Sequence, residues 1–326
     1  MTAIRTPGSL ILDEDQPSTN MPFVSATAMS QLCTIVDAVD ALEESLRSGF
    51  DPEQDLMRTL APVPAGTLLM MPSALGTYAG LKLVSIAPGN PDLGKPLVQA
   101  VYVLVDATSL TPLATFDGTY LTNLRTSAVS ALAARHLARP GTNRLVVFGA
   151  GVQGWAHVQS LSQVLPLQHV DVVGRSPERA TALVNRIRSE LGIEATVSTP
   201  GSVADADAVA CCTTARQPLF DGRLLRPGAT VVAIGAYEPD ARELDDDTLA
   251  RGIVVIESVA SALREAGDVI QGIDAAALDR KDLTTLRDLV CGDVSLSDDA
   301  VRVFKGTGMS WQDLSVAGML YGRLPH

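Results

Sequence analysis

The sequence predicts an α/β fold, with a Rossmann doubly wound sheet plus a smaller α+β domain, and three observations support this prediction. A strand, a glycine-rich turn and a helix follow one another directly between residues 144 and 164. From residue 144 onward, short apolar strands alternate regularly with helical patterns, which is typical of a doubly wound parallel sheet. Before residue 120, strand-like runs follow one another without helices between them, which favours an antiparallel sheet.

The first part of the chain is expected to hold a helix and the antiparallel sheet. The helix is predicted over residues 28–46, and a second helix, over residues 122–138, is predicted to bridge the two parts of the chain. The strand-like runs between these helices cover residues 66–71, 78–86 and 97–106. Residues 1–20 are polar and lack a sustained apolar run, so we expect a loose segment there and no signal peptide.

The second part of the chain is expected to contain six parallel strands. They are predicted at residues 144–149, 169–174, 194–198, 207–212, 229–235 and 252–257. Helical patterns such as residues 178–191 lie between them, as crossover connections between parallel strands require. The tail, residues 301–320, is predicted to form a short turn and a helix that returns to either domain.

The glycine-rich turn has the G-x-G-x-x-G spacing of a dinucleotide-binding loop. Gly149 permits a tight turn, Gly151 lets the backbone approach a pyrophosphate, and Gly154 lets the following helix pack closely on the strand. Val152 and Gln153 lie between these glycines, where the free N–H groups and positive dipole end of the helix attract phosphate. The alternative is a glycine-rich turn of another α/β unit, but the flanking strand and helix favour dinucleotide binding.

The end of the next strand predicts which dinucleotide is bound. A site for NAD usually has an acidic residue there, to hydrogen-bond the ribose 2′-hydroxyl. This chain has Gly174 at that point, followed by Arg175 and Ser176, with Arg179 one turn further on. Two guanidinium groups and a hydroxyl suit a 2′-phosphate, so we predict NADPH. The alternative is that the two arginines form a solvated surface pair; Asp171 lies three residues too early, inside the strand.

Composition disfavours several other functions. The chain has 326 residues, enough for two domains, and a formal net charge of −12, which disfavours a nucleic-acid partner. Its four cysteines lack metal-binding spacing, so we expect a reducing compartment, no disulfide and no metal. The longest apolar run, around residues 97–105, is about half the ~20 residues of a membrane helix. We therefore expect a soluble, cytoplasmic protein with no membrane partner.

Four basic residues lie where a solvated charge is unusual. Lys82 shares a strand face with apolar residues, so it either reaches outward to solvent or points at an anion. Arg125 falls in the first turn of its predicted helix, where a cation opposes the helix dipole unless an anionic ligand or a salt bridge offsets it. Arg58 lies in a loop and is unremarkable alone, and Lys305 either helps to close the cofactor site or is simply exposed.

Taken together, these features resemble the ornithine cyclodeaminase/mu-crystallin family over nearly the whole chain. The most specific feature is Leu-Arg-Thr-Ser-Ala at residues 124–128, which precedes Gly-Ala-Gly-Val-Gln-Gly at residues 149–154. Further matching stretches, in the family's order, are residues 68–72, 80–82, 88–90, 242–245, 266–268 and 304–308. The resemblance implies a homodimer formed through a substrate-binding and dimerisation domain, residues 1–120 with 300–326, beside a Rossmann domain, residues 121–299.

The resemblance also implies roles for individual residues. It implies that Arg58, Lys82 and Arg125 together hold the α-carboxylate of an amino or imino acid between the first domain and the nicotinamide. Three cations around one carboxylate neutralise its charge and fix its orientation. Thr213 and Thr214 resemble the residues that end a Rossmann strand beside the cofactor.

The chain departs from the cyclodeaminases of this family at two carboxylates. Their catalytic Asp, two residues before the Pro of residues 235–239, is replaced by Tyr237, and a Glu within residues 68–72 is replaced by Leu69. A phenol with a pKa near 10 is nearly all protonated at pH 7 and is a poor base. Cyclodeaminases also recycle a retained NAD, whereas the residues after the second Rossmann strand of this chain predict NADPH. Both departures favour a reductase over a lyase.

We therefore predict an NADPH-dependent reductase that converts an α-imino acid to an L-amino acid; NADH is the less favoured cofactor. The imino acid is either cyclic, a ketimine or Δ1-pyrroline-2-carboxylate, or linear, formed from a keto acid and an amine. Lys82, or a water ordered near Tyr237, supplies or stabilises the proton on nitrogen. The alternatives are an ornithine or lysine cyclodeaminase with retained NAD, an alanine-dehydrogenase-like enzyme, and a non-catalytic NADPH-binding protein.

Overall fold

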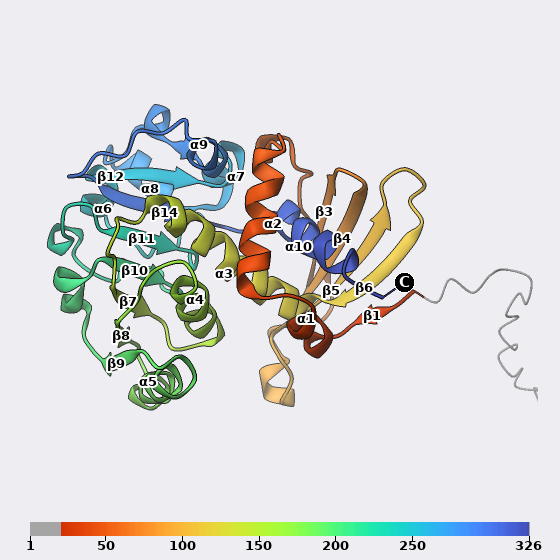
Figure 1. Ribbon diagram of the computed structural model, residues 1–326, viewed down its shortest axis with the longest axis horizontal. Coiled ribbons are helices and arrows are strands. Elements are labelled where there is room, and N and C mark those ends of the chain that lie inside the picture. Colours follow the sequence, from red (N-terminus) through yellow and green to blue (C-terminus); the bar gives the residue numbers. More distant parts are fainter. Residues whose placement is uncertain (1–20, 326) are drawn as a thin grey trace, which may run out of the picture.

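The chain folds into two halves, each built on its own sheet, with helix α3 (Gly118–Leu137) running between them (Figure 1). The structure is a computed structural model that describes residues 21–325. The N-terminal segment predicted to be loose, residues 1–20, lies outside the described residues. The predicted fold class, a Rossmann sheet plus a smaller α+β domain, is confirmed.

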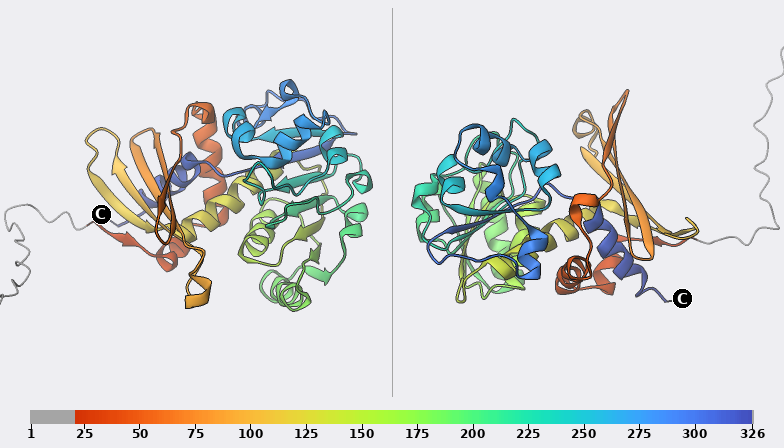
Figure 2. Two further views of the ribbon diagram at one scale, coloured as in Figure 1. Left: turned by 180° about the vertical axis from the view of Figure 1, so that it is seen from behind. Right: turned by 90° about the horizontal axis from the view of Figure 1, so that it is seen from above.

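The smaller half is a six-stranded sheet in the order β1-β6-β5-β4-β3-β2. Its strands are β1 Phe23–Val24, β2 Thr59–Val63, β3 Gly66–Leu75, β4 Tyr78–Ile86, β5 Val98–Asp106 and β6 Pro112–Asp117. Neighbouring strands from β2 to β6 are antiparallel, as predicted, and β1 pairs with β6 in parallel. Helix α10 (Ser310–Tyr321) packs on β3, β4 and β5, and helix α2 (Ile35–Arg47) lies beside it (Figures 1 and 2).

The single helix predicted over residues 28–46 is in fact two helices, α1 (Ala26–Leu32) and α2. The break comes from local capping at Thr34, whose hydroxyl accepts a hydrogen bond from the backbone N–H of Asp37. The Asp37 carboxylate accepts in return from the backbone N–H of Thr34, at 2.7 Å. This reciprocal capping box starts a new helix where a simple apolar pattern suggests continuation.

Helix α3 begins earlier than predicted, at Gly118 instead of residue 122. Asp117 is its N-cap, and the Asp117 carboxylate accepts from the backbone N–H groups of Thr119 and Tyr120. Arg125 therefore lies about two turns inside α3. The prediction that Arg125 occupies the first turn is wrong, and the argument from the helix dipole does not apply to it.

The larger half is a parallel sheet in the order β13-β12-β14-β11-β10-β7-β8-β9. Its strands are β7 Arg144–Phe148, β8 His169–Val173, β9 Glu194–Val197, β10 Ala208–Cys211, β11 Thr230–Ala233, β12 Gly252–Ile256, β13 Thr284–Thr285 and β14 Val301–Lys305. Its helices are α4 Val152–Ser162, α5 Pro177–Leu191, α6 Asp246–Ala250, α7 Val259–Glu265, α8 Gly267–Asp274 and α9 Leu286–Cys291. Short 3₁₀ turns lie at η1 Pro52–Gln54, η2 Pro91–Leu93, η3 Pro200–Asp205, η4 Gly222–Leu224 and η5 Arg280–Asp282.

The sheet of the larger half has two strands more than the six that the sequence predicts. The missed strand β14 lies between β11 and β12, in a tail that was expected to be a turn and a helix. All five residues of β14 are buried, so they complete the core of this sheet. The predicted boundary at residue 300 is therefore wrong for residues 301–305, and only the segment that follows them returns to the smaller half as α10.

Within residues 21–325, no helix is both long enough and apolar enough to span a bilayer. All four cysteines lie in this part of the chain and have free thiols.

Candidate active site

A pocket of about 800 Å³ opens at the carboxyl ends of β7, β8 and β10. The residues predicted to bind a cofactor that line it are Gly149, Gly151, Arg175, Ser176, Arg179, Thr213 and Thr214. This edge of an open α/β sheet is where ligands generally bind, because the crevice lies outside the carboxyl ends of the strands.

The three glycines of the turn have the environments that their predicted roles require. Gly149 has a φ of +104°, which strains any L side chain, and an added Cβ would lie 2.5 Å from the carbonyl oxygen of Cys212. An added Cβ on Gly154 would lie 1.9 Å from the carbonyl oxygen of Gly149, so helix α4 packs directly on the turn. At Gly151 an added Cβ would meet no atom within 4 Å, because this backbone faces the open pocket.

The first turn of α4 presents free backbone groups to the pocket. Gly151 is the N-cap and has no side chain to satisfy the first N–H groups of the helix. Val152 is 65% exposed, which is unusual for an apolar side chain and leaves its surface free to be covered. The Gln153 side chain instead donates to the Asn123 side chain on α3, at 2.9 Å, so only its backbone is directed at the turn. These groups fit the pyrophosphate of a dinucleotide.

The pocket's second end carries the two arginines predicted to select NADPH. Ser176 is the N-cap of α5: its hydroxyl accepts from the backbone N–H of Arg179 and donates to the Glu178 carboxylate at 2.7 Å. Glu178 is a carboxylate beside the predicted phosphate position that sequence reasoning missed, although its place in a helix's first turn is a signal for it. Asp171 is buried and paired with Arg144 at 2.8 Å, so it is not available to a ribose.

A buried carboxylate fixes the loop after β10, which lines the pocket, and the loop after β11. Glu243 accepts hydrogen bonds from the backbone N–H and the hydroxyl of Thr213, and from the backbone N–H of Gly235. It therefore ties the loop after β10 to the loop after β11. Burial raises the pKa of Glu243, and the nearby Lys305 ammonium opposes this rise.

Lys305 does not line the pocket, contrary to the prediction that it binds the cofactor, and it is not exposed either. It is 1% exposed at the end of β14, and its ammonium lies 3.1 Å from the buried carboxylate of Asp268. Asp268 in turn accepts from the backbone N–H groups of Glu243 and Leu244. Lys305 thus balances two buried acids beneath the pocket, because β14 is an interior strand whose end is covered.

Lys82 and Arg125 meet in the smaller half around one carboxylate. Lys82 is 1% exposed, so the alternative that it reaches solvent is excluded. Its ammonium lies 2.6 Å from the Asp313 carboxylate, and the Arg125 Nε lies 3.5 Å from the other oxygen of that carboxylate. Burial, and then the neighbouring Arg125, lower the pKa of Lys82 to about 8, while Asp313 opposes the fall.

Arg58 lies just before β2 and contacts the other half of the molecule. Its Nε donates to the Glu265 carboxylate at 2.8 Å, and a second nitrogen is also paired with Glu265, from helix α7. Burial, and then the charge of Arg264, lower the pKa of Arg58. Arg58 also acts on the pKa of Lys82, and Tyr237 acts on that of Arg58, so these side chains lie within electrostatic reach. Tyr237 is 55% exposed.

We refer to Arg58, Lys82, Arg125 and Asp313 as the cation cluster. Two further side chains connect this cluster to the edge of the parallel sheet. Gln312 accepts from Arg125 at 2.8 Å and donates to Glu257, which follows β12. Glu257 also accepts from the backbone N–H groups of Thr307 and Gly308, in the loop between β14 and α10. The cluster therefore faces the same carboxyl edge of the sheet as the cofactor pocket.

Comparison with known proteins identifies the family that this arrangement belongs to. Residues 20–326 match the ornithine cyclodeaminase/mu-crystallin family. The chain belongs to this family. Ketimine reductase mu-crystallin of Mus musculus is 32% identical over 270 residues, which cover 81% of this chain and 83% of the mouse protein. The family resemblance predicted from sequence is thus confirmed.

Two solved structures of similar proteins contain nicotinamide cofactors. The Δ(1)-pyrroline-2-carboxylate reductase of Thermococcus litoralis, in complex with NADH and L-proline, is 27% identical with a TM-score of 0.86 and covers 93% of this chain and 97% of its own. An archaeal alanine dehydrogenase dimer with bound NAD is 28% identical with a TM-score of 0.86 and covers 93% and 95%. The mouse and Thermococcus proteins are reductases of imines.

Sequence reasoning missed four acidic or amide side chains that contact Arg58, Lys82 or Arg125, or that connect these cations to the parallel sheet. They are Glu257, Glu265, Gln312 and Asp313. The one local signal for any of them is the position of Gln312 and Asp313 in the first turn of α10, because helix N-termini favour acidic residues. The partners of these side chains lie far away in sequence, so their roles appear only in the folded chain.

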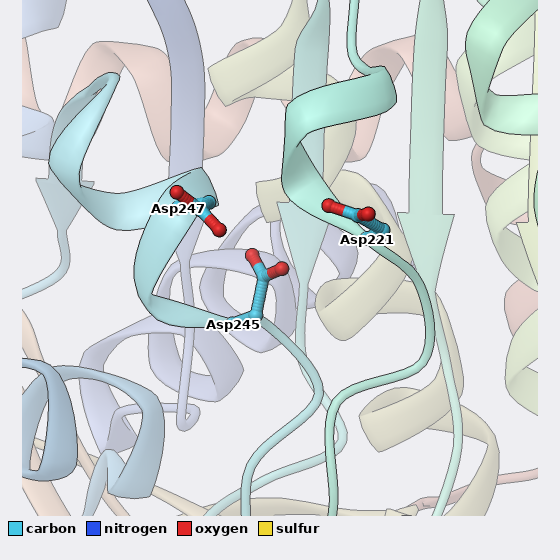
Figure 3. Close-up of side chains that lie close together, drawn as sticks. All are labelled: Asp221, Asp245 and Asp247. Carbon is cyan, nitrogen blue, oxygen red and sulfur yellow. The ribbon is translucent and has the colours of Figure 1, made fainter.

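Three other acidic residues of the larger half lie close together (Figure 3). Asp221, Asp245 and Asp247 place ligand atoms within 4.8 Å of one another. Asp245 caps α6 by accepting from Thr248, and Asp221 caps η4 and pairs with Arg223, which also lies near Asp247. Capping and ion pairing account for these carboxylates, and the prediction that the chain uses no metal stays a prediction.

Proposed function

We propose that this chain is an NADPH-dependent reductase that converts an α-imino acid to an L-amino acid. The observation that carries the proposal is the cluster in which the buried cations Lys82 and Arg125 share the single carboxylate of Asp313. One positive charge is left over in a desolvated place that faces the carboxyl edge of the sheet. A ligand carboxylate supplies the missing negative charge.

The cluster also retains hydrogen-bonding capacity for such a ligand. At 3.5 Å, the Arg125 Nε makes no hydrogen bond to Asp313, and it is a buried donor that has no partner within residues 21–325. A planar guanidinium binds a carboxylate through two parallel bonds, and the Lys82 ammonium adds a point charge. Arg58, which lies just before β2 and contacts Glu265 of the larger half, would fix the third side of the substrate carboxylate.

The reaction needs a hydride at the imine carbon and a proton at its nitrogen. Bound NADPH supplies the hydride. Lys82, whose pKa is lowered by burial to about 8, is mostly charged at pH 7 and still acidic enough to donate a proton. The exposed Tyr237 phenol offers a second route, through a water that it orders near the substrate nitrogen.

The chain lacks the two carboxylates expected of a cyclodeaminase. Leu69 lies on β3 opposite Val84, and Tyr237 follows β11 in a loop. Neither side chain can serve as a carboxylate base for the release of ammonia. We therefore favour reduction over the lyase reaction, with a cyclic ketimine or pyrroline-2-carboxylate, or a linear imine, as substrate.

The preference for NADPH rests on the side chains at the second end of the pocket. Arg175 and Arg179 both line it, and the acidic residue expected for NAD binding is absent at Gly174. Glu178 opposes this preference, because its carboxylate lies beside the same position. Two exposed guanidinium groups against one carboxylate still favour a phosphate.

We further propose that the chain acts as a homodimer in the cytoplasm, as the cysteine pattern and the family resemblance suggest. One face of the six-stranded sheet carries Lys82 and packs on α10, whereas the opposite face carries a central group of half-buried apolar side chains, with Ser85 and Gln99 at one end, and no helix of residues 21–325 covers it (Figure 2). These side chains include Leu68, Met70, Leu81, Leu83, Val101 and Val103. Such a contiguous apolar face is typical of a subunit interface.

The experiment that tests the reductase is a substrate screen that follows NADPH absorbance. Cyclic imino acids, and keto acids mixed with ammonia or methylamine, should consume NADPH stoichiometrically and yield L-amino acids. Turnover with pyruvate and ammonia alone would identify an alanine-dehydrogenase-like enzyme. Release of ammonia and proline from L-ornithine with only catalytic NAD would identify a cyclodeaminase, and tight NADPH binding without turnover would identify a binding protein.

A further inference from the structure

The carboxylate of Asp313 occupies a central position between the two substrate-facing cations. Asp313 is 0% exposed and lies in the first turn of α10. One of its oxygens contacts the Lys82 ammonium at 2.6 Å, and the other lies 3.5 Å from the Arg125 Nε without a hydrogen bond. These two cations come from β4 and α3, so Asp313 is the group from α10 that joins them.

The charges that face Lys82 show why this carboxylate matters. Arg125 on α3 and Arg58 before β2 are cations, and both lower the pKa of Lys82. Tyr102 is paired opposite Lys82 on β5, and burial and the charge of Asp313 raise the pKa of its phenol, so it stays neutral. Among these groups, Asp313 is the one negative charge in contact with Lys82.

Asp55 is a second acid within electrostatic reach of Asp313 and Tyr102, but its hydrogen bonds are made to other groups. It accepts from the Ser73 hydroxyl and from the backbone N–H groups of Leu56 and Trp311. Burial raises the pKa of Asp55, which further weakens it as a counter-charge. Asp55 instead anchors the N-terminal turn of α10 in place.

Asp313 is itself held in place by these neighbours. The N–H of Trp311 is fixed by Asp55, and Gln312 is fixed between Arg125 and Glu257. The first turn of a helix is a position that favours a carboxylate. A carboxylate this constrained can determine where its partner cations point, since side chains locked by neighbours give precise sites.

We propose that Asp313 is a positioning residue: its carboxylate aligns the Lys82 ammonium and the Arg125 guanidinium for the substrate carboxylate and balances one of their two charges before substrate binds. This inference rests on the proposed function, in which those two cations bind substrate. Asp313 touches neither substrate nor cofactor in this scheme and acts through the two cations.

The test uses the full-length chain and a probe that cannot be reduced. Pyrrole-2-carboxylate is a planar cyclic carboxylate that has no C=N bond, so it cannot accept a hydride as an imino acid does. Its affinity is measured by calorimetry from pH 6 to pH 9.5, with and without NADPH, for the wild type, Asp313→Asn and Asp313→Glu. Because charged Lys82 binds the carboxylate, affinity should be full below the pKa of Lys82 and should fall as pH rises through it.

Loss of the Asp313 charge should lower the pKa of Lys82 further, since the opposing cations remain. In Asp313→Asn the fall in affinity should therefore move to lower pH by about one unit or more, and affinity at pH 7 should drop about tenfold or more. Asp313→Glu keeps the charge but displaces it, so the pH midpoint should stay while affinity falls severalfold. Affinity for NADPH should not change in either variant.

The matched control is Asp171→Asn, which removes another buried acid, one that is paired with the partly exposed Arg144 in the larger half. It should leave both the affinity and the pH midpoint of the probe unchanged. An Asp313→Asn variant with the wild-type midpoint and an affinity within about twofold of wild type would overturn the proposal. If that variant does not fold, Asp313→Glu decides: wild-type affinity for the probe would then overturn it.

These experiments distinguish a failure of the role proposed for Asp313 from a failure of the proposed function. A wild type that binds the probe with the expected pH dependence but reduces no imino acid contradicts the reductase and leaves the role of Asp313 standing. A wild type that reduces imino acids while Asp313→Asn keeps its affinity contradicts only the positioning role. A wild type that does not bind the probe at any pH contradicts the inference itself, because its cations then bind no carboxylate.

Discussion

The two parts of the active site are built in different ways. In the cofactor pocket, the turn predicted to hold the pyrophosphate is backbone from one continuous stretch, residues 149–154. The segments after β8, β9 and β10 supply the rest of the lining, which includes exposed arginines. The cation cluster is made of side chains from separate segments: Lys82, Arg125 and Asp313 are buried, and Arg58 is half-buried. A backbone site is thus encoded locally, whereas a side-chain site exists only when distant segments meet.

This difference has consequences for energetics. Exposed charges such as those of Arg175 and Arg179 interact through water and are screened by salt, so each contributes modestly. Buried charges in the cluster have lost their hydration, and removing one partner leaves the other uncompensated. Substitutions in the cation cluster should therefore have much larger effects than substitutions at the ribose end of the cofactor pocket.

The largest effect is expected for Lys82→Ala and Arg125→Ala. Each should lower kcat/KM by about a hundredfold or more while leaving the Kd for NADPH unchanged, because the cluster contacts substrate alone. Losses should be far from additive in the double variant, since the two cations act on one carboxylate. Steady-state kinetics and NADPH titration measure both quantities.

The control for these variants is Lys95→Ala, which removes an exposed lysine from the loop between β4 and β5. It should leave kcat/KM within about twofold of wild type. Near-normal kcat/KM in Lys82→Ala would contradict both proposed roles of Lys82 and would remove the contrast between the two parts of the site.

A smaller effect is expected for Tyr237→Phe, whose side chain is exposed and lies within electrostatic reach of Arg58. Loss of the phenolic hydroxyl should reduce kcat by about ten- to a hundredfold, or about 1.4–2.7 kcal/mol, if it orders a water at the substrate nitrogen. KM should change little, because the carboxylate is bound elsewhere. An unchanged kcat would leave Lys82 as the proton donor without help from Tyr237.

The same contrast explains what could be predicted from the sequence. The glycine turn, its strand and its helix are contiguous, so spacing alone predicted the strand and the helix that flank Gly149, Gly151 and Gly154, and the role of these glycines in binding a cofactor stays a prediction. The arginines of the cluster were individually weak signals, and only the family resemblance grouped them. Apart from the place of Asp313 in the first turn of a helix, no pattern indicated Asp313 or Glu265, because their contacts with Lys82 and Arg58 each span more than two hundred residues of sequence.

The errors of sequence reasoning have physical causes of the same kind. Strand β14 was missed because a short buried strand gives no periodicity that separates it from a turn next to a helix. Lys305 was expected at the cofactor or in solvent, but the interior position of β14 buries it against Asp268. Arg125 was placed in the first turn of α3 because the capping role of Asp117 was not recognised.

A modest effect is expected for Arg175→Ala at the ribose end of the pocket. It should weaken NADPH binding by roughly tenfold and leave NADH binding nearly unchanged, since only the 2′-phosphate meets the guanidinium. Arg188→Ala, near the other end of α5, is the matched control and should change neither affinity. Equal affinities of the wild type for NADPH and NADH would reject the assignment to NADPH.

The smallest effect, and the one of opposite sign, is expected for Glu178→Gln. Glu178 holds the Ser176 hydroxyl, and that hydrogen bond lowers the pKa of Glu178, so the carboxylate is ionised at neutral pH. Its charge lies beside Arg175 and Arg179 and repels a 2′-phosphate, whereas a neutral amide would not. Glu178→Gln should therefore tighten NADPH binding about two- to fivefold, with a gain that shrinks as salt is added.

The same variant also tests the alternative cofactor. If Glu178 instead accepts a hydrogen bond from a ribose 2′-hydroxyl, as an acid does in NAD sites, the substitution should weaken NADH binding and leave NADPH binding unimproved. Titration of both cofactors into wild type and Glu178→Gln at low and high salt distinguishes the two cases. Arg175 and Arg179 line this end of the pocket, and Glu178 is hydrogen-bonded to Ser176, which also lines it, so the sign of this small change decides which of these groups meets the ribose.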